Sequence, residues 1–241
     1  MHRVRAPGAS VRGGPSRFTS AQTQACAWYS GREPVTAVTD YLLSAVFLAF
    51  ALRLLNRSCS ERQISLQLAA ATFFSTFLGA LAGGTYHLIG GQVLWKATIY
   101  CIGLGGFLMV ASAAFVATVG SPRRILLIGA GLQFVAFGAW VVTHDDFRYV
   151  IYDYGAAMLL MLALFCWASY RRLSASTPWI LASVLLAIAG SAFQASGFDL
   201  HRNFNHNDAY HIIQIGAGWL LYRGFWGSRD RIPNQPFRIP F

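Results

Sequence analysis

The sequence predicts an all-α fold, a seven-helix bundle in an integral membrane protein, and three observations support this prediction. Hydrophobic residues make up 55% of the 241 residues, charged residues make up 12%, and the mean hydropathy is +0.45. Such a composition is too apolar for an ordinary soluble domain. Apolar stretches recur at the length that crosses a hydrocarbon core of about 30 Å, which is roughly 20 helical residues. The connections between them are short and carry turn residues.

Seven apolar segments meet or nearly meet the length of a membrane span. They lie at about 35–55, 64–88, 93–119, 125–143, 149–170, 178–196 and 206–225. Short connections such as "GGQ" and "GSPRR" separate them. Because these segments fill the chain between residues 34 and 226, we expect one seven-transmembrane domain at 34–226 and no separate soluble domain.

The two ends of the chain have the composition of tails. Residues 1–33 carry five arginines and no acidic residue before Glu33. They lack the apolar stretch of a secretory signal, so we expect a disordered basic tail, with an organellar transit peptide as the alternative. Residues 227–241 are few and interrupted by proline. We expect them to form a C-terminal tail.

Basic residues at the helix ends predict the orientation of the bundle. Loops on the side of the C-terminus carry most of the arginines, including Arg123 and Arg124, whereas the opposite loops carry only Lys96, Arg148 and Arg202 beside several aspartates. By the positive-inside rule, this places the C-terminus in the cytoplasm. No soluble face combines basic with aromatic residues, so we expect membrane lipids as partners and no nucleic acid.

Ionisable residues gather at one end of the predicted bundle. The helix ends opposite the C-terminus carry Asp40, His87, Lys96, Asp153 and His211. An ionisable group at membrane depth costs a few kcal/mol on insertion scales, so such groups usually face the bundle interior, pair with one another or form a site. We therefore expect Asp40 to be buried inside the bundle.

The start of the last segment, "HNDAYH" at residues 206–211, is rich in polar side chains. On a helix with about 100° per residue, Asn207 lies about 40° and Asp208 about 60° from His211, so either can point with it toward one centre. His206 lies about 140° from His211 and can join them only from an unwound turn before the helix. We expect His87 and His211 to converge with Asp208 or Asn207 on one polar pocket.

Two short motifs resemble those of a known membrane family. The second segment ends in "GGTYH", from Gly83 to His87, and the last begins with "NDAYH", from Asn207 to His211. On seven helices, this pattern resembles the alkaline ceramidase and adiponectin-receptor superfamily, in which Ser-x-x-x-His ends the second helix and His-x-x-x-His opens the seventh. Gly83 and Asn207 stand at the serine and at one histidine position. The resemblance implies a zinc-dependent hydrolase of lipid amides such as ceramide.

The residues themselves suggest a metal-dependent site. The candidate metal ligands are His87, His211, Asp208 and His206. Imidazoles with a carboxylate suit zinc or iron and leave a position for water. A metal-bound water, with its pKa lowered toward about 7, would attack an amide or ester of a lipid. Asp40 or Asp153 would then act as a general base or orient a histidine.

Other classes of function remain open on the sequence. A non-catalytic seven-helix receptor or scaffold would keep the fold without the metal, and Gly83 and Asn207 favour it. A haem-binding electron carrier would need histidines at matched depth across a large pocket, and the sequence offers no second such pair. In a purely structural role, the histidines would bond to neighbouring helix ends and Asp40 would pair with Lys96.

Overall fold

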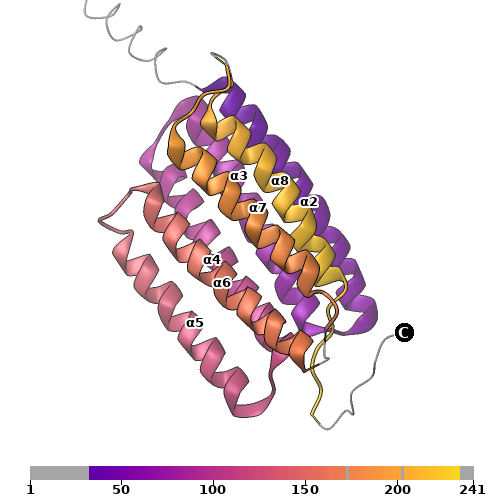
Figure 1. Cartoon of the computed structure of the whole chain (residues 1–241). Helices are drawn as coiled ribbons and strands as arrows, with labels where there is room; N and C mark the ends of the chain where they lie inside the picture. The colour runs from indigo at the N-terminus through magenta and orange to yellow at the C-terminus, as the bar shows by residue number, and fades with distance from the viewer. Residues whose placement is uncertain (1–32, 172–173, 202–203, 234–241) are drawn as a thin grey trace, which may run out of the picture. The chain divides into compact units, whose positions relative to one another are not determined.

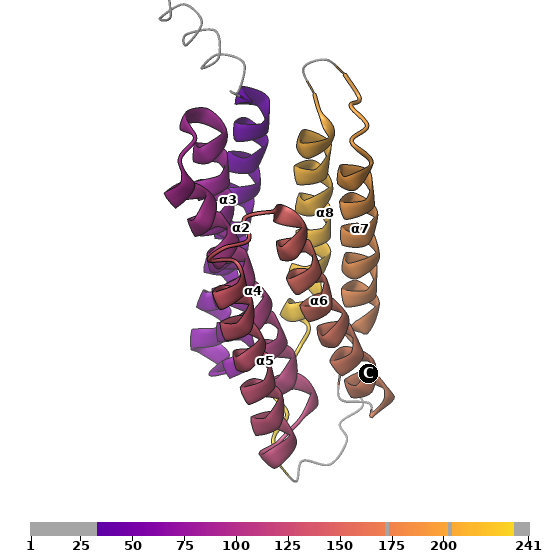
Figure 2. The ribbon, with the colours of Figure 1, turned by 90° about the vertical axis from the view of Figure 1, so that its left-hand side faces the viewer.

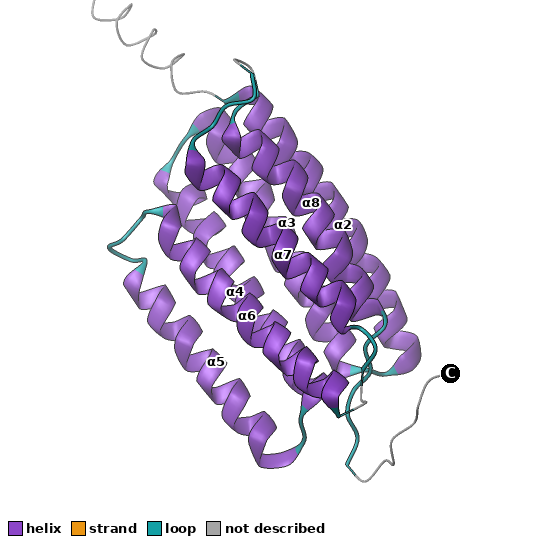
Figure 3. Cartoon of the chain, viewed as in Figure 1, coloured by secondary structure: helices purple, strands orange, loops and turns teal. Residues whose placement is uncertain are grey.

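The computed structural model describes residues 33–171, 174–201 and 204–233. Most of the expected basic tail and the last part of the C-terminal tail lie outside these residues. Seven α-helices follow one another (Figures 1 and 3): α2 Pro34–Glu61, α3 Ile64–Ile89, α4 Gln92–Ala117, α5 Gly120–Trp140, α6 Phe147–Tyr170, α7 Thr177–Ser196 and α8 His206–Trp226. Each predicted segment coincides with one helix, so the all-α, seven-helix prediction is confirmed for the described residues.

Five of these helices, α2, α3, α4, α6 and α7, are long and apolar enough to cross a membrane. The chain is therefore a multi-pass membrane protein by the composition of its helices. Helices α5 and α8 are each 21 residues long. Both begin with polar or charged sequence, "GSPRR" and "HNDAYH", which lowers their mean hydropathy. The cytoplasmic position of the C-terminus stays a prediction.

Local sequence explains where several helices begin and end. Helix α2 starts at Pro34. Proline lacks a backbone N–H, and this costs no hydrogen bond in the first turn, where an N–H has no partner within the helix. Helices α3 and α4 are separated by Gly90 and Gly91, whose φ values of +71° and +106° are ones that other residues rarely adopt. Helix α8 starts with a capping box, in which Asn205 accepts from the N–H of Asp208 and the Asp208 carboxylate accepts from the N–H of Asn205.

Six of the helices close a ring and the seventh lies outside it. Helix α2 packs on α3, α3 on α4, α4 on α6, α6 on α7, α7 on α8, and α8 returns to α2. Helix α5 packs mainly on α4 and buries only Ala130 and Phe137, and Figures 1 and 2 show it at the edge of the bundle. The ring therefore surrounds an interior to which α5 contributes little.

Aromatic residues fill one part of this interior. Where α2, α3 and α8 meet, neighbouring rings lie 4.7–6.5 Å apart in stacked and edge-to-face pairs; they belong to Phe47, Phe50, Phe73, Tyr222 and Phe225. These residues come from the middle of α2, the first half of α3 and the end of α8. They close the bundle on the side away from the ends that carry His87 and His211.

The segment after α8 fastens the bundle at the aromatic side. The Asp230 carboxylate accepts hydrogen bonds from the backbone N–H groups of Ile64 (2.7 Å) and Ser65 (2.8 Å) at the start of α3. The neighbouring Arg231 donates to the carbonyls of Phe115 and Ala117 near the end of α4. A carboxylate at a helix start and a cation at a helix end both complement the helix dipole. Residues 230–231 therefore belong to the bundle.

Candidate functional site

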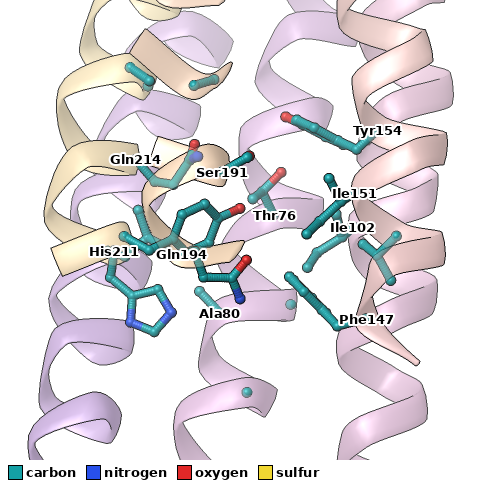
Figure 4. A pocket seen from close by; sticks show the side chains of 18 of the residues that line it. Thr76, Ala80, Ile102, Phe147, Ile151, Tyr154, Ser191, Gln194, His211 and Gln214 are labelled. Atoms are coloured by element: carbon teal, nitrogen blue, oxygen red, sulfur yellow. The ribbon is translucent and has the colours of Figure 1, made fainter. Parts of the chain in front are cut away.

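A cavity of about 680 Å³ lies inside the ring of six helices. Every helix of the ring contributes to its wall, and the wall is mostly apolar, with Phe47 and Leu221 among the residues at the aromatic side. Polar side chains gather at the other side, where Asp40, His87 and His211 line the cavity. Figure 4 shows several of the lining side chains, including His211, pointing into this space. A volume of this size with few polar groups is typical of a small-molecule site.

Asp40 links the two histidines at the polar side of the cavity. Its side chain is buried on the first turns of α2, with 5% of the residue exposed. One carboxylate oxygen, Oδ1, lies 3.3 Å from Nε2 of His211, and the other, Oδ2, lies 4.0 Å from Nε2 of His87. We call these three residues the His–Asp–His cluster. Asp40 is buried, as predicted, and both histidines line one cavity, where they face Asp40 and not Asp208, the carboxylate that the sequence predicts beside them.

The His211 ring is fixed by a hydrogen bond on its other nitrogen. Oγ1 of Thr39 lies 2.9 Å from Nδ1 of His211 and also donates to the carbonyl of Thr36 at 2.9 Å. A hydroxyl has one proton, so Thr39 accepts from the ring and the Nδ1 of His211 carries the proton. In the neutral ring, Nε2 is then an acceptor that faces Asp40.

The His87 ring lies beside Glu33, in an ion-pair contact that lacks the geometry of a hydrogen bond. Nδ1 of His87 lies 3.1 Å from the Glu33 carboxylate, and the backbone N–H of Glu33 donates to the His87 carbonyl at 3.2 Å. The Glu33 oxygen nearest the ring has no hydrogen-bond partner among the described residues, so this contact does not fix which nitrogen of His87 carries the proton. Nε2 of each ring faces an oxygen of the same Asp40 side chain. A shared proton or a cation is needed to make this arrangement favourable.

The cluster has some features of a metal site and lacks others. Ligands at 2.0–2.2 Å from a tetrahedral zinc ion lie about 3.3–3.5 Å from one another. The distance from Asp40 to His211 fits this range, and the 4.0 Å from Asp40 to His87 exceeds it. In the described part of the chain, no group of three or more His, Cys, Asp or Glu side chains is placed to hold a metal ion.

The other two predicted metal ligands form no hydrogen bond or ion pair with the described residues of the cluster. Asp208 is buried at the third position of α8, where Oδ2 caps the helix and Oδ1 has no hydrogen-bond partner among the described residues. His206 bonds Asp199 at the surface, with Nδ1 2.9 Å from Oδ1. The hydrogen bonds from the ring and backbone N–H of His206 lower the pKa of the Asp199 carboxyl. The structure thus joins the two histidines to Asp40 and not to Asp208 or His206.

Two further expectations about carboxylates turn out differently. Asp153, a predicted general base, accepts from the side chain of Gln133 at 3.1 Å, so it joins α6 to α5 and does not line the cavity. Lys96, the predicted structural partner of Asp40, instead pairs with Asp145 and with the carbonyl of Val141. Asp40 therefore faces the two histidines and does not pair with Lys96.

No sequence pattern points directly to the residues that lie against the outer nitrogens of the two rings. Glu33 stands alone as an acid in a basic stretch, and Thr39 directly precedes Asp40 in "TAVTDY". Each signal is weak by itself, because a threonine in a membrane helix usually bonds its own backbone. Only the approach of α2 to the end of α3 and the start of α8 gives these residues their partners.

The fold and cavity define the class of this chain: a multi-pass helical membrane protein with a polar cluster at one side of an interior cavity. The chain belongs to a family of unknown function (DUF6962), whose model matches residues 35–230. This match covers all seven helices apart from the first residue of α2. No curated protein and no solved structure matched the sequence.

Proposed function

We propose that the protein is an intramembrane hydrolase of lipid amides or esters and that the His–Asp–His cluster is its catalytic site. One observation carries the proposal: two imidazole nitrogens and both oxygens of Asp40 converge at the polar side of an otherwise apolar cavity. Buried ionisable groups in such an arrangement need a proton, a cation or a reacting group between them. Clusters of ionisable groups at membrane depth are characteristic of function.

The cavity suits an amphiphilic substrate. Its apolar wall would bury an acyl chain, while the carbonyl group would lie beside the cluster. The amides of Asn207 and Gln194, which bond each other at 3.3 Å, line the same cavity and offer hydrogen-bond partners for the head group. This arrangement parallels the resemblance of the sequence to ceramidases, which supports a lipid amide such as ceramide as the first substrate to test.

The cluster also contains the donor types that zinc prefers. His87, His211 and Asp40 would hold the ion, which supplies a Lewis acid and a coordinated water of lowered pKa. Glu33 and Thr39 would orient the rings through Nδ1, as partners of metal-binding histidines usually do. Binding would require His87 and Asp40 to approach from their present 4.0 Å.

A second candidate function is a lipid-binding receptor or scaffold without catalysis. Gly83 and Asn207 favour it, because they stand where the similar family has a serine and a histidine. Gly83 allows the close approach of Asp40, since a Cβ atom there would lie only 3.3 Å from Oδ2 of Asp40. The two candidates share the cavity and differ only in whether the bound lipid is cleaved.

Release of fatty acid from ceramide and from a long-chain ester by the purified protein in lipid nanodiscs would test the proposal. We expect His211→Ala and Asp40→Asn to abolish turnover, because each removes one member of the cluster. Matched controls are His206→Ala, on the same helix end, and Asp153→Asn, which lies outside the cavity. Metal analysis of wild type and His87→Ala would show whether the cluster binds zinc. Bound lipid without turnover in any form would support the receptor instead.

A further inference from the structure

A second polar group lies in the cavity, farther along α8 than the cluster. Gln214 follows His211 by three residues, so it projects on the same side of the helix about 4.5 Å farther along its axis. Figure 4 shows Gln214, Ser191, Thr76 and Tyr154 around this part of the cavity, at a different level from the His211 ring. These residues come from α8, α7, α3 and α6, so the polar group spans the cavity.

The Gln214 amide has no partner within the described structure. It lines the cavity and forms no hydrogen bond with a described residue. Its Nε2 atom lies beside Gly190 of α7, where a Cβ atom would approach it to 3.5 Å. The neighbouring Gln194 amide, by contrast, bonds Asn207. An amide without a partner at membrane depth is costly, so we expect a molecule in the cavity to bond it.

The chemistry around Gln214 selects a neutral hydrogen-bonding group. Ser191 contacts the phenol of Tyr210, and Thr76 contacts the phenol of Tyr154 and donates to the carbonyl of Thr72, so Gln214 is the member of this group without a partner; none of these neighbours is charged. An amide both donates and accepts, which matches an alcohol in both roles. A ligand that satisfies this group would carry a hydroxyl within an otherwise apolar chain.

We propose that Gln214 and Ser191 recognise a hydroxyl on the acyl chain, so that the preferred lipids have a hydroxyl on the third carbon. The inference rests on the proposed function, which places the substrate carbonyl beside His211. The advance of about 4.5 Å along α8 is near the ~3.8 Å that three bonds span in an extended chain. In a 3-hydroxyacyl chain, the hydroxyl oxygen lies three bonds from the carbonyl carbon. A chain without the hydroxyl would leave the amide unpaired.

Equilibrium binding of two radiolabelled lipids would test this inference. The probes are N-3-hydroxyhexadecanoyl ethanolamine and N-hexadecanoyl ethanolamine, measured on the full chain in nanodiscs. We expect the wild type to prefer the hydroxylated lipid by about tenfold, the usual effect of one buried hydrogen bond. Gln214→Leu should abolish the preference, and Ser191→Ala should reduce it. Gln67→Leu, the same change at an exposed position outside the cavity, should leave it intact.

Each outcome decides between the two proposals. Equal affinity of the wild type for both lipids, no binding of either, or a preference that survives Gln214→Leu would overturn the inference. A preference that depends on Gln214, with neither lipid cleaved, would keep the recognition and remove the hydrolase. Cleavage of both lipids, bound with equal affinity, would keep the hydrolase and remove the recognition of the hydroxyl. Gln214→Leu replaces an unpaired amide, so it should fold, and Ser191→Ala gives a second, independent measurement.

Discussion

Replacement of Thr39 by valine would test how the His211 ring is held. The change keeps the shape of the side chain and removes the hydroxyl that accepts from Nδ1 of His211 at 2.9 Å. A buried donor left without a partner costs about 1–3 kcal/mol. The carbonyl of Thr36 loses a hydroxyl contact but keeps its place in the backbone hydrogen bonds of α2. We therefore expect nearly the whole effect to arise at His211.

Thermal unfolding of the purified protein in detergent would measure this loss. For a chain of this size, 1 kcal/mol corresponds to about 2–4 °C in Tm, so Thr39→Val should lower Tm by roughly 2–12 °C. The control is Thr72→Val, because the hydroxyl of Thr72 is also buried but bonds only the carbonyl of Leu68 at 2.9 Å. Thr72→Val should lower the free energy of unfolding by less than about 1 kcal/mol.

A double-mutant cycle separates the ring from other effects of the hydroxyl. In a His211→Phe background there is no Nδ1 donor, so Thr39→Val should have little further effect on the free energy of unfolding. If Thr39→Val lowers Tm equally in both backgrounds, the hydroxyl does not act through His211. The proton assignment in the cluster would then lose its basis.

Three further predictions concern other parts of the bundle. Asp230→Ala should lower the free energy of unfolding by about 1–2 kcal/mol, because two N–H groups at the start of α3 lose their acceptor; denaturant titration in mixed micelles would measure it, and no change would contradict the fastening role. Gly84→Ala should cost about 1–3 kcal/mol, because its Cβ would meet side-chain atoms of α2 at 3.0 Å, whereas Gly83→Ala, with contacts of 3.3 Å and more, should cost less in the same titration. The pKa of Asp199 is lowered in the folded state, so its ionised carboxylate stabilises the fold. This contribution to the free energy of unfolding is complete above the unfolded pKa of about 3.9 and is lost as the pH falls through the folded pKa. NMR titration should show the Asp199 pKa rising toward its ordinary value in His206→Ala.

The fold follows from sequence features that act locally, and the site does not. Apolar length and turn residues alone place all seven helices, since a membrane span depends on a single segment. Which carboxylate reaches the two histidines depends on which helices pack together. Asp208 is close to His211 in sequence, yet its carboxylate caps the start of α8 in a capping box with Asn205. Asp40, far from both histidines in sequence, reaches them because α2 packs between α3 and α8.

The way the cluster uses its protons separates a functional site from a structural one. If the histidines served only to fasten helices, each ring would stabilise the bundle most directly by donating its N–H to the buried carboxylate of Asp40. Instead, Nδ1 of His211 donates to Thr39, and its Nε2 faces Asp40 as an acceptor. The pair is then favourable only when a proton, a cation or a substrate group lies between Nε2 and the carboxyl group. A group that can gain and lose such a partner is suited to chemistry, which is why the cluster, and not the tighter aromatic core, is the place to look for it.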